Sequence, residues 1–341
     1  MGLHRCLIGI TGGSGYIGSS LAKHLAGSFD VRLLDVRVPK QRFSEAVSFQ
    51  VCDVRNYEEV KKALEGVDLV IHAAIVQIPL INEDKRLGYE VDILGTQNVC
   101  RAVDENPRIK GLILAGSWHT VGERELRGVI DEEFGFRPDK VEDRARLYAL
   151  AKIAQESVVR FYDEMSEKVF GIVRMGTVLG EGMPEKTAAN IFITNGLRGK
   201  PLTPFKHSMF RPMLYVDVDD VCRAYENFAR KILNGKVNEE GNSLAHIFNV
   251  YYPEPITILE LAEIVRDAIV KYSGGRIEPE IEVVDAGQPS MFSKEDIDLI
   301  RVDVSKALSF LGLVRLKNPE VSIEEIVEAR IKERKLMGRL Y

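Results

Sequence analysis

The sequence of 341 residues is poor in the features that mark secreted, membrane-spanning and nucleic-acid-binding proteins. Its four cysteines are far apart and form no C-x-x-C pair, which favours buried thiols in a reducing compartment over disulfides or a metal site. No apolar run approaches the ~18 residues that would suggest a membrane span. The formal net charge of −5 gives no electrostatic basis for binding nucleic acid or an anionic membrane.

Two further absences concern targeting and metals. Residues 1–8 lead directly into a strand-like run and leave no separate apolar region for a signal peptide, so we expect a cytoplasmic protein. The histidines show no metal-ligand spacing, so we expect no metal site.

The composition is that of a globular protein, with 45% hydrophobic and 28% charged residues. Short β-branched runs alternate with amphipathic stretches, which predicts an α/β fold with a doubly wound, Rossmann-type parallel sheet. The strands are read as continuous hydrophobic runs, as expected when helices cover both faces of a sheet. The predicted strands are 6–10, 31–34, 47–51, 69–72, 112–115 and 169–173, and the predicted helices are 16–26, 57–64, 88–103 and 145–165.

The pattern changes after Gly176, where prolines and glycines cluster. A strand at 213–216 and a helix from Asp219 are predicted to return to the sheet, followed by a strand at 246–250 and a helix beginning near Ile256. The length exceeds what one core usually supports, so we expect two lobes. They are an NAD-binding Rossmann domain of residues 1–175 and 213–250, and a smaller, discontinuous α/β substrate lobe of residues 176–212 and 251–341.

A glycine-rich turn follows the first predicted strand. Gly13, Gly15 and Gly18 satisfy G-x-G-x-x-G, Gly12 adds a fourth glycine, and a helix is predicted to begin at Tyr16. Small residues let the backbone approach a pyrophosphate, and the N-terminus of a helix presents free N–H groups to that anion. The strand and helix on either side are the context that makes this motif specific for a dinucleotide.

The second strand ends at Asp35, 23 positions after Gly12 (35 − 12). A carboxylate at about this distance binds the ribose hydroxyls of the adenosine. It would repel a 2′-phosphate by up to ~4 kcal/mol at 4 Å and an effective dielectric near 20. The sequence therefore favours NAD over NADP, although Arg37 offers a cation that would soften this preference.

Tyr148 and Lys152 lie one helical turn apart in a helix-forming stretch, so their side chains share one face. A free tyrosine has a pKa near 10, and a neighbouring ammonium would favour the phenolate. Because this pair follows a predicted nucleotide-binding half of the chain, it is the leading candidate for the catalytic residues.

Further motifs extend along nearly the whole chain. They are Asp53-Val54, His72-Ala73-Ala74, the GTQNV run at 95–99, Ser117 at the end of the fifth strand, the RMGTVLG run at 174–180, the run at 211–221, and the DVSKA run at 303–307 with Leu311-Gly312. Together with the glycine turn and the Tyr-Lys pair, they resemble the extended short-chain dehydrogenase/reductase family, particularly its nucleotide-sugar epimerase and dehydratase branch (UDP-glucose/galactose 4-epimerase-like).

This resemblance implies a set of site residues. Tyr148 would be the general base, with Ser117 bonded to the same substrate oxygen and Lys152 bonded to the nicotinamide ribose. Arg211 would pair with a substrate diphosphate, or alternatively with Asp217 or Asp219, and Asn190 would lie near the nucleotide. NAD would contact Gly12, Gly15, Tyr16, Ile17, Gly18, Asp35, Asp53, Val54, Ala73, Ala74, Tyr148 and Lys152. The resemblance also implies a homodimer through the helices at 88–103 and 145–165.

Several positions depart from the family's pattern. Trp118 and His119 follow Ser117 where dehydratases carry an acidic residue, which disfavours dehydration. The Ser-Trp-His-Thr-Val-Gly run is similar to Ser-Asn-His-Thr-x-Gly of uronate dehydrogenases, where it contacts a sugar carboxylate. Trp118 and His119 are therefore candidate substrate contacts, and His119 is alternatively a residue that tunes Tyr148 or a structural histidine. Asp92 and Thr177 each stand where the family usually has Asn.

Three functions remain open at this point. The first is an NAD-dependent nucleotide-sugar epimerase, acting at C4 of a UDP-sugar through a transient keto-sugar and return of the hydride. The second is a net NAD-dependent dehydrogenase for a sugar, a uronate or another hydroxy compound. The third is a non-catalytic NAD-binding regulatory protein, which the intact Ser117, Tyr148 and Lys152 disfavour.

Overall fold

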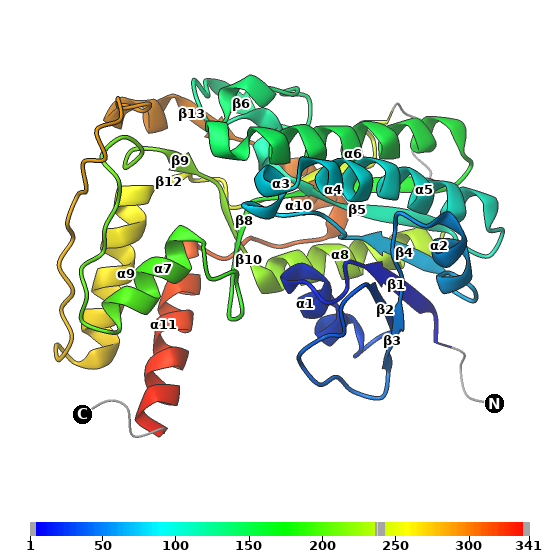
Figure 1. The fold of residues 1–341 in the computed structure, drawn as a ribbon, viewed down its shortest axis with the longest axis horizontal. Helices are drawn as coiled ribbons and strands as arrows, with labels where there is room; N and C mark the ends of the chain where they lie inside the picture. Colours follow the sequence, from blue (N-terminus) through cyan, green and yellow to red (C-terminus); the bar gives the residue numbers. More distant parts are fainter. Residues whose placement is uncertain (1–4, 236, 238–242, 337–341) are drawn as a thin grey trace.

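The computed structural model describes residues 5–235, 237 and 243–336. Seven parallel strands form its central sheet in the order β11-β7-β5-β4-β1-β2-β3, which is the strand order of a Rossmann fold (Figure 1). The strands are β1 (Leu7–Thr11), β2 (Asp30–Asp35), β3 (Val47–Val51), β4 (Leu69–His72), β5 (Gly111–Ser117), β7 (Val169–Met175) and β11 (Ile247–Val250). The predicted fold class is confirmed.

Helices cover both faces of this sheet, so the strands other than the edge strand β3 are mostly buried and apolar (Figure 1). On one face α1 (Tyr16–Leu25) packs against α8 (Val218–Leu233). On the other face α5 (Gly95–Glu105) packs between α2 (Tyr57–Ala63) and α6 (Arg146–Met165). Because parallel strands end at a common edge, the turns after β1, β4 and β5 lie close together there.

The predicted helix at 88–103 is not continuous. The chain instead forms α4 (Lys85–Tyr89), a turn of π-helix (Glu90–Leu94) and then α5. A π turn inserts one extra residue into the helical ladder, and such turns are frequent at functional sites. Here the turn carries Asp92, whose Oδ1 accepts a hydrogen bond of 2.7 Å from the backbone N–H of Val76 in the loop after β4.

The prediction that 213–216 returns to the central sheet is wrong. β9 (Pro212–Met213) pairs with β12 (Ile256–Thr257), and β10 (Tyr215–Asp217) pairs with β8 (Thr177–Leu179), each outside the seven-stranded sheet. The place beside β7 is taken by β11, so β10 cannot pair there. Of the two segments that were predicted to return to the central sheet at this point, only the helix, α8, packs against it.

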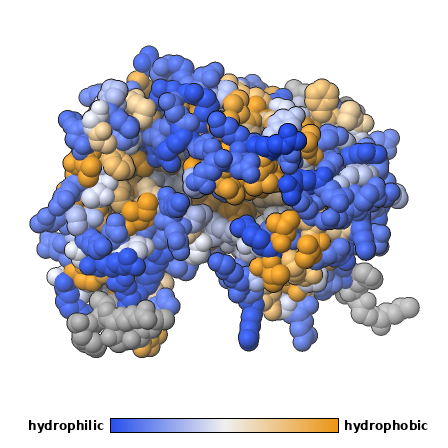
Figure 2. Space-filling view, in the orientation of Figure 1, coloured by the Kyte–Doolittle hydropathy of each residue, from blue (hydrophilic) through white to orange (hydrophobic). Residues whose placement is uncertain are grey.

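The second lobe is formed by α7 (Ala188–Gly196), α9 (Ile258–Ser273) and α11 (Pro319–Leu336), with α9 packed against both of the others (Figure 1). The surface is hollowed between this lobe and the domain that carries the glycine turn (Figure 2). A late segment also reaches back to the larger domain. There, β13 (Ile300–Val302) pairs in parallel with β6 (Gly128–Ile130), close to α10 (Ser305–Leu311) in sequence.

The remaining helical segments of the described chain are short. They are α3 (Leu80–Glu83) and the 3₁₀ turns Trp118–Val121, Pro138–Lys140, Asp143–Ala145 and Lys294–Leu299. Among the described residues, no helix combines the length and apolar character needed to cross a membrane. The same residues include no group of His, Cys, Asp and Glu side chains placed to hold a metal ion.

Candidate active site

The glycine turn after β1 is packed too tightly for side chains. Gly12 has a φ of +66°, and a Cβ there would lie 2.6 Å from the backbone nitrogen of Ala74. A Cβ on Gly18 would lie 2.6 Å from the carbonyl oxygen of Gly12. Both positions therefore require glycine. Ala73 lies against the same turn, with its N–H donating to the Thr11 carbonyl at 3.0 Å.

Helix α1 begins immediately after this turn with an open N-terminus. Its N-cap residue is Gly15, and no side chain caps the first turn. The first N–H groups of the helix are therefore available to an anion. Ile17 packs against the core, while the buried Tyr16 hydroxyl has no hydrogen-bond partner among the described residues.

Asp35 ends β2 beside the turn and is held by backbone groups. Its carboxylate accepts hydrogen bonds from the N–H of Ser14 at 3.1 Å and of Arg37 at 3.0 Å. The Arg37 guanidinium is mostly exposed, with its Nε 3.9 Å from the carboxylate. The tight glycine turn, the uncapped helix and this fixed carboxylate together fit the pyrophosphate and ribose of NAD.

Asp53 and Val54, predicted to lie near the adenine, follow β3. Val54 is buried against α5, where a Cβ on Gly95 would lie 2.6 Å from its Cγ2. Asp53 is paired with Arg55, with 2.6 Å between Oδ2 and Nη2. Hydrogen bonds from Arg55 hold the pKa of the Asp53 carboxyl below its usual range.

Tyr148 and Ser117 meet at the carboxyl edge of the sheet. Ser117 ends β5, and its side chain interacts with the Tyr148 hydroxyl, as does that of Gln77 from the loop after β4. Burial raises the pKa of Tyr148 to about 12, and these two interactions oppose the rise. Tyr148 is therefore a neutral phenol in the ligand-free protein near pH 7.

Lys152 lies on the same face of α6, with its Nζ 5.9 Å from the centre of the Tyr148 ring. It donates hydrogen bonds to the Ala115 carbonyl at 2.7 Å and to Gln155 Oε1 at 3.0 Å. Burial lowers its pKa to about 8, while the negative charge of Asp92 opposes that shift. The ammonium is thus directed into a buried polar network.

Asp92 is the charged partner of this network. Its side chain is fully buried, and Oδ2 has no hydrogen-bond partner among the described residues. Burial raises the pKa of Asp92 to about 7. The departure from the Asn usual in the family therefore places a titratable group where its charge acts on Lys152.

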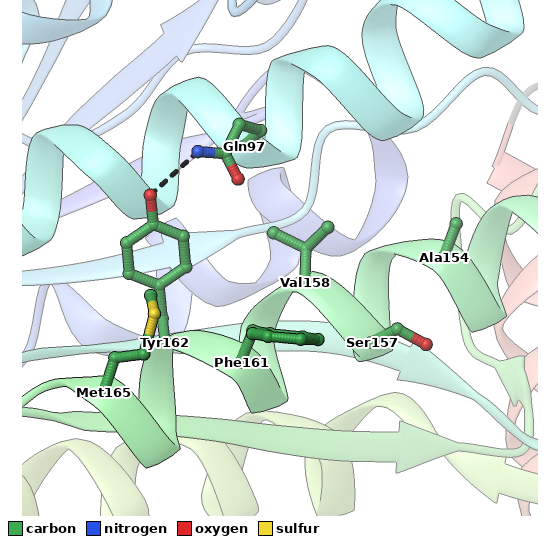
Figure 3. Close-up of a pocket in the computed structure, with 7 residues that line it drawn as sticks. All are labelled: Gln97, Ala154, Ser157, Val158, Phe161, Tyr162 and Met165. Carbon is green, nitrogen blue, oxygen red and sulfur yellow. Dashed lines mark hydrogen bonds between the residues drawn. The ribbon is translucent and has the colours of Figure 1, made fainter.

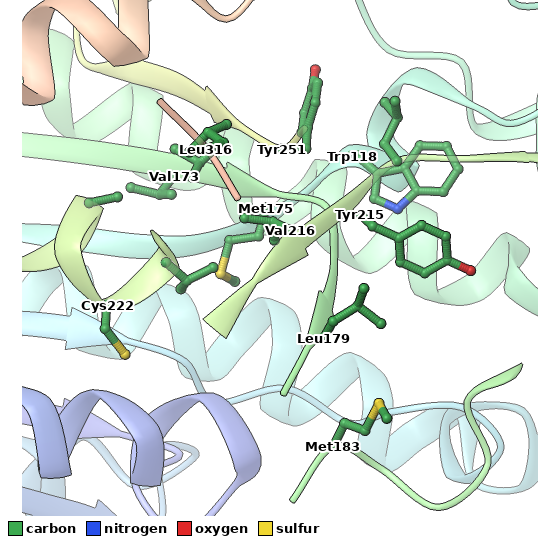
Figure 4. Packing of buried hydrophobic residues seen from close by; sticks show 14 of the residues in the cluster. Trp118, Val173, Met175, Leu179, Met183, Tyr215, Val216, Cys222, Tyr251 and Leu316 are labelled. Atoms are coloured by element: carbon green, nitrogen blue, oxygen red, sulfur yellow. The ribbon is translucent and has the colours of Figure 1, made fainter. Parts of the chain in front are cut away.

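Trp118 and His119 begin the turn after β5, and their rings lie side by side, with 4.7 Å between the ring centres. Trp118 is 1% exposed, donates from Nε1 to Thr177 Oγ1 at 3.3 Å, and packs in the core near Tyr215 (Figure 4). It therefore anchors the turn and does not reach the surface. His119 lies edge-on to the Tyr148 ring, with 5.6 Å between the ring centres.

Arg211 and Asn190 are both engaged by the protein itself. Arg211 is 6% exposed, and its Nη1 lies 2.7 Å from Glu142 Oε1 and 3.9 Å from Glu123 Oε1. Its partners are thus these two glutamates and not Asp217 or Asp219. Asn190 donates to the Met183 carbonyl at 2.8 Å and accepts from Arg330 at 2.8 Å.

The sequence analysis missed four residues around Tyr148, Lys152 and Arg211. They are Gln77, Glu123, Glu142 and Gln155. The proximity of Gln155 to Lys152 could have been predicted from the sequence, because Gln155 lies three positions after Lys152 on the same helix. The other three lie in loops, where no periodicity shows which side chains meet.

The fold and the glycine turn are those of a protein that binds a dinucleotide. The chain belongs to the NAD-dependent epimerase/dehydratase family, whose model ("NAD dependent epimerase/dehydratase family") matches residues 8–250.

Curated relatives and solved structures agree with this family. The chain is 34% identical over 132 residues to "Short-chain dehydrogenase/reductase family 42E member 1" of Danio rerio, covering 38% of this chain and only 34% of that relative. It is 28% identical to "Uronate dehydrogenase" of Pseudomonas syringae pv. tomato, covering 52% and 59%. The structure resembles UDP-glucuronic acid 4-epimerase from Bacillus cereus in complex with UDP-glucuronic acid and NAD. That similarity has a TM-score of 0.71 at 20% identity and covers 96% of this chain and 99% of the other.

Proposed function

We propose that the protein is a net NAD-dependent dehydrogenase that oxidises a secondary hydroxyl of a sugar, a uronate or a related hydroxy compound. The observation that carries this proposal is the position of Tyr148. Its hydroxyl interacts with the Ser117 side chain at the sheet edge where the glycine turn also lies.

The chain supplies the acid–base chemistry of this reaction. Tyr148, as its phenolate, takes the proton from the substrate hydroxyl, and Ser117 donates a hydrogen bond to the same oxygen. Lys152 orients the ribose and contributes positive charge beside the phenolate. When bound, NAD supplies the hydride acceptor, a positively charged nicotinamide ring.

The state of Arg211 favours a substrate without a diphosphate. Its charge is already balanced by Glu142 and Glu123, so a diphosphate would compete with two buried carboxylates for the guanidinium. Asn190, the other residue expected near a nucleotide, is also fully engaged. The relative named uronate dehydrogenase carries out the type of reaction we propose, with a sugar acid as substrate.

A second candidate is a nucleotide-sugar epimerase acting at C4 of a UDP-sugar. The family model and the overlap with an epimerase along 96% of the chain favour it. An epimerase returns the hydride to the sugar, so it releases neither NADH nor a proton to solution.

One experiment separates the two candidates. The purified protein and NAD are mixed with one of two sets of compounds. The first set contains free sugars, uronates and sugar phosphates, and the second contains UDP-linked hexoses and hexuronates. Accumulation of NADH with an unlinked compound supports the dehydrogenase. An epimer formed from a UDP-sugar without NADH supports the epimerase, and Tyr148→Phe must abolish whichever activity appears.

We also propose a homodimer through α5 and α6. Apolar side chains on α6 are exposed, including Leu150 at 45%, Phe161 at 70% and Met165 at 64%. They flank a pocket lined by Gln97, Ala154, Ser157, Val158, Phe161, Tyr162 and Met165 (Figure 3). An exposed apolar patch of this kind is typical of a protein–protein interface. In the dimer, these helices would form a four-helix bundle.

Two further expectations accompany this function. We propose that residues 1–175 and 213–250 form the cofactor domain, with 176–212 and 251–341 as the substrate lobe, although residues 1–4, 236, 238–242 and 337–341 lie outside the described chain. We also propose a cytoplasmic location, which the free thiols of all four cysteines support.

A further inference from the structure

The His119 ring lies between the catalytic serine and a buried carboxylate. Its Nδ1 is 3.2 Å from Ser117 Oγ, and its Nε2 is 3.5 Å from Glu123 Oε1. Since the Ser117 side chain also interacts with the Tyr148 hydroxyl, a row of neighbouring polar groups runs from Tyr148 through Ser117 and His119 to Glu123.

The hydrogen bonds at Ser117 leave its proton free to move along this row. The backbone N–H of His119 donates to Ser117 Oγ at 3.2 Å, which occupies one lone pair of that oxygen. The serine proton is therefore available to either the Tyr148 oxygen or His119 Nδ1. The main chain thus fixes the serine oxygen between two proton acceptors.

The charges around His119 balance one another. Glu123 and Glu142 face Arg211 and Arg144, with 2.6 Å between Arg144 Nε and Glu142 Oε2. Burial, together with these two arginines, lowers the pKa of His119, whereas the carboxylates of Glu123 and Glu142 oppose that shift. His119 is therefore neutral near pH 7 and able to accept a proton, and Glu123 stabilises the imidazolium that forms.

The ring also has a way out to solvent. The His119 side chain is 19% exposed, while the side chain of Glu123 is 1% exposed. Of these two residues, His119 is therefore the one that solvent reaches.

We propose that His119 is a positioning and relay residue that carries the proton of Tyr148 to solvent. The proton on the Tyr148 oxygen passes to Ser117 Oγ as the serine proton passes to His119 Nδ1, and the imidazolium then gives one ring proton to water. Each O–H or N–H bond that breaks is matched by one that forms. No electrons move along this path.

This inference rests on the proposed dehydrogenase function, because only a net oxidation has to dispose of a proton in every cycle. An epimerase returns the same proton from Tyr148 to the sugar. A path from the phenol to solvent is useful to a dehydrogenase and unnecessary for an epimerase.

The test follows proton release when NAD binds, in the absence of any substrate. Tyr148 is a neutral phenol in the ligand-free protein, so forming its phenolate must release one proton. The whole protein is mixed rapidly with NAD in weak buffer containing a pH indicator. We expect a release that is absent in Tyr148→Phe, and that is slower by about tenfold or more in His119→Gln, in keeping with the usual effect of losing a proton-transfer group.

Two controls separate the relay from a structural role. His24→Gln removes a histidine that pairs with Glu226 at 2.7 Å on α1, outside the path, and should release the proton at the wild-type rate. Binding of NADH, followed by its fluorescence, should be equal in all variants. Added imidazole should restore the rate in His119→Gln, as expected for a missing proton carrier and not for a distorted fold.

The outcomes are distinct from those of the proposed function. Wild-type rates in His119→Gln, or no release that depends on Tyr148, would overturn the relay. A normal relay in a protein that reduces no NAD with any hydroxy compound would instead overturn the dehydrogenase and leave the proton path in place. Lowering the pH should slow the release, because protonated His119 cannot accept another proton.

Discussion

Arg211 and Glu142 form a buried ion pair, with 2.7 Å between Nη1 and Oε1. Arg211 comes from the segment just before β9, and Glu142 comes from the long loop before α6. The pair joins the second half of the chain to the first beside His119. It also shows that a residue expected to bind substrate has a structural partner.

Replacing Arg211 by Met should lower the free energy of unfolding by about 3–5 kcal/mol, because it leaves buried carboxylate charge without its partner. Urea denaturation measures the change. The matched control is Arg86→Met, since Arg86 pairs with Glu90 at the surface and is 87% exposed. That variant should lose less than ~1 kcal/mol. Equal losses in the two variants would contradict a buried role for the Arg211 pair.

Tyr148→Phe should lower kcat by about 10²–10⁴-fold, the usual contribution of a positioned acid–base group. Its affinity for NADH, measured by fluorescence, should stay within a few-fold of wild type. Tyr89→Phe removes the hydroxyl of an exposed tyrosine on α4 and should leave kcat unchanged. A Tyr148→Phe variant with full activity would remove Tyr148 from the mechanism.

Asp35→Asn should improve the use of NADP relative to NAD. The substitution keeps an oxygen that accepts the Ser14 N–H but removes the charge that repels a 2′-phosphate. The ratio of kcat/KM values should shift by up to about 10³-fold, which corresponds to ~4 kcal/mol. Asp30→Asn, at the other end of β2, should not change the ratio.

Asp92→Asn should lower the pKa of Lys152 below its value of about 8, because the carboxylate of Asp92 favours the ammonium. The hydrogen bond from the Val76 N–H is retained by the amide oxygen. NMR of ¹³C-labelled lysine follows the titration, and Lys152→Met identifies the signal. A pKa that rises in Asp92→Asn would show that the two groups do not interact as described.

Phe161→Asp should convert a dimer to a monomer, because it places a charge in the apolar patch on α6. Light scattering after gel filtration gives the mass. Val314→Asp introduces the same charge at a valine that is 96% exposed elsewhere and should remain dimeric. A wild-type protein that is monomeric at high concentration would rule out the proposed interface.

Much of the cofactor half could be predicted from local pattern. The buried strands were predicted to within about two residues because continuous apolar runs are typical of a parallel sheet. Gly12 and Gly18 could be predicted because the backbone leaves no room for a Cβ at either position. In these segments the conformation is determined by neighbouring residues in the sequence.

The surroundings of Tyr148 could not be predicted in the same way. Glu123 and Glu142 meet Arg211 only after the chain has folded, and an ion pair between distant residues leaves no periodic signal. The pairing of β10 with β8 was missed because two short apolar strands carry no information about which neighbour each will choose. The π turn at Asp92 was missed because its sequence is also compatible with a continuous helix.

The parallel pairing of β6 with β13 joins residues 128–130 to residues 300–302. The loop that contains β6 also supplies Glu123 and Glu142. Because β13 lies near the end of the sequence, this loop gains its strand partner only when the ribosome has made most of the chain. The Rossmann core is able to form earlier, whereas the surroundings of His119 are completed late in synthesis. A nascent chain arrested before Ile300 should therefore already bind NADH and still expose this loop to proteases.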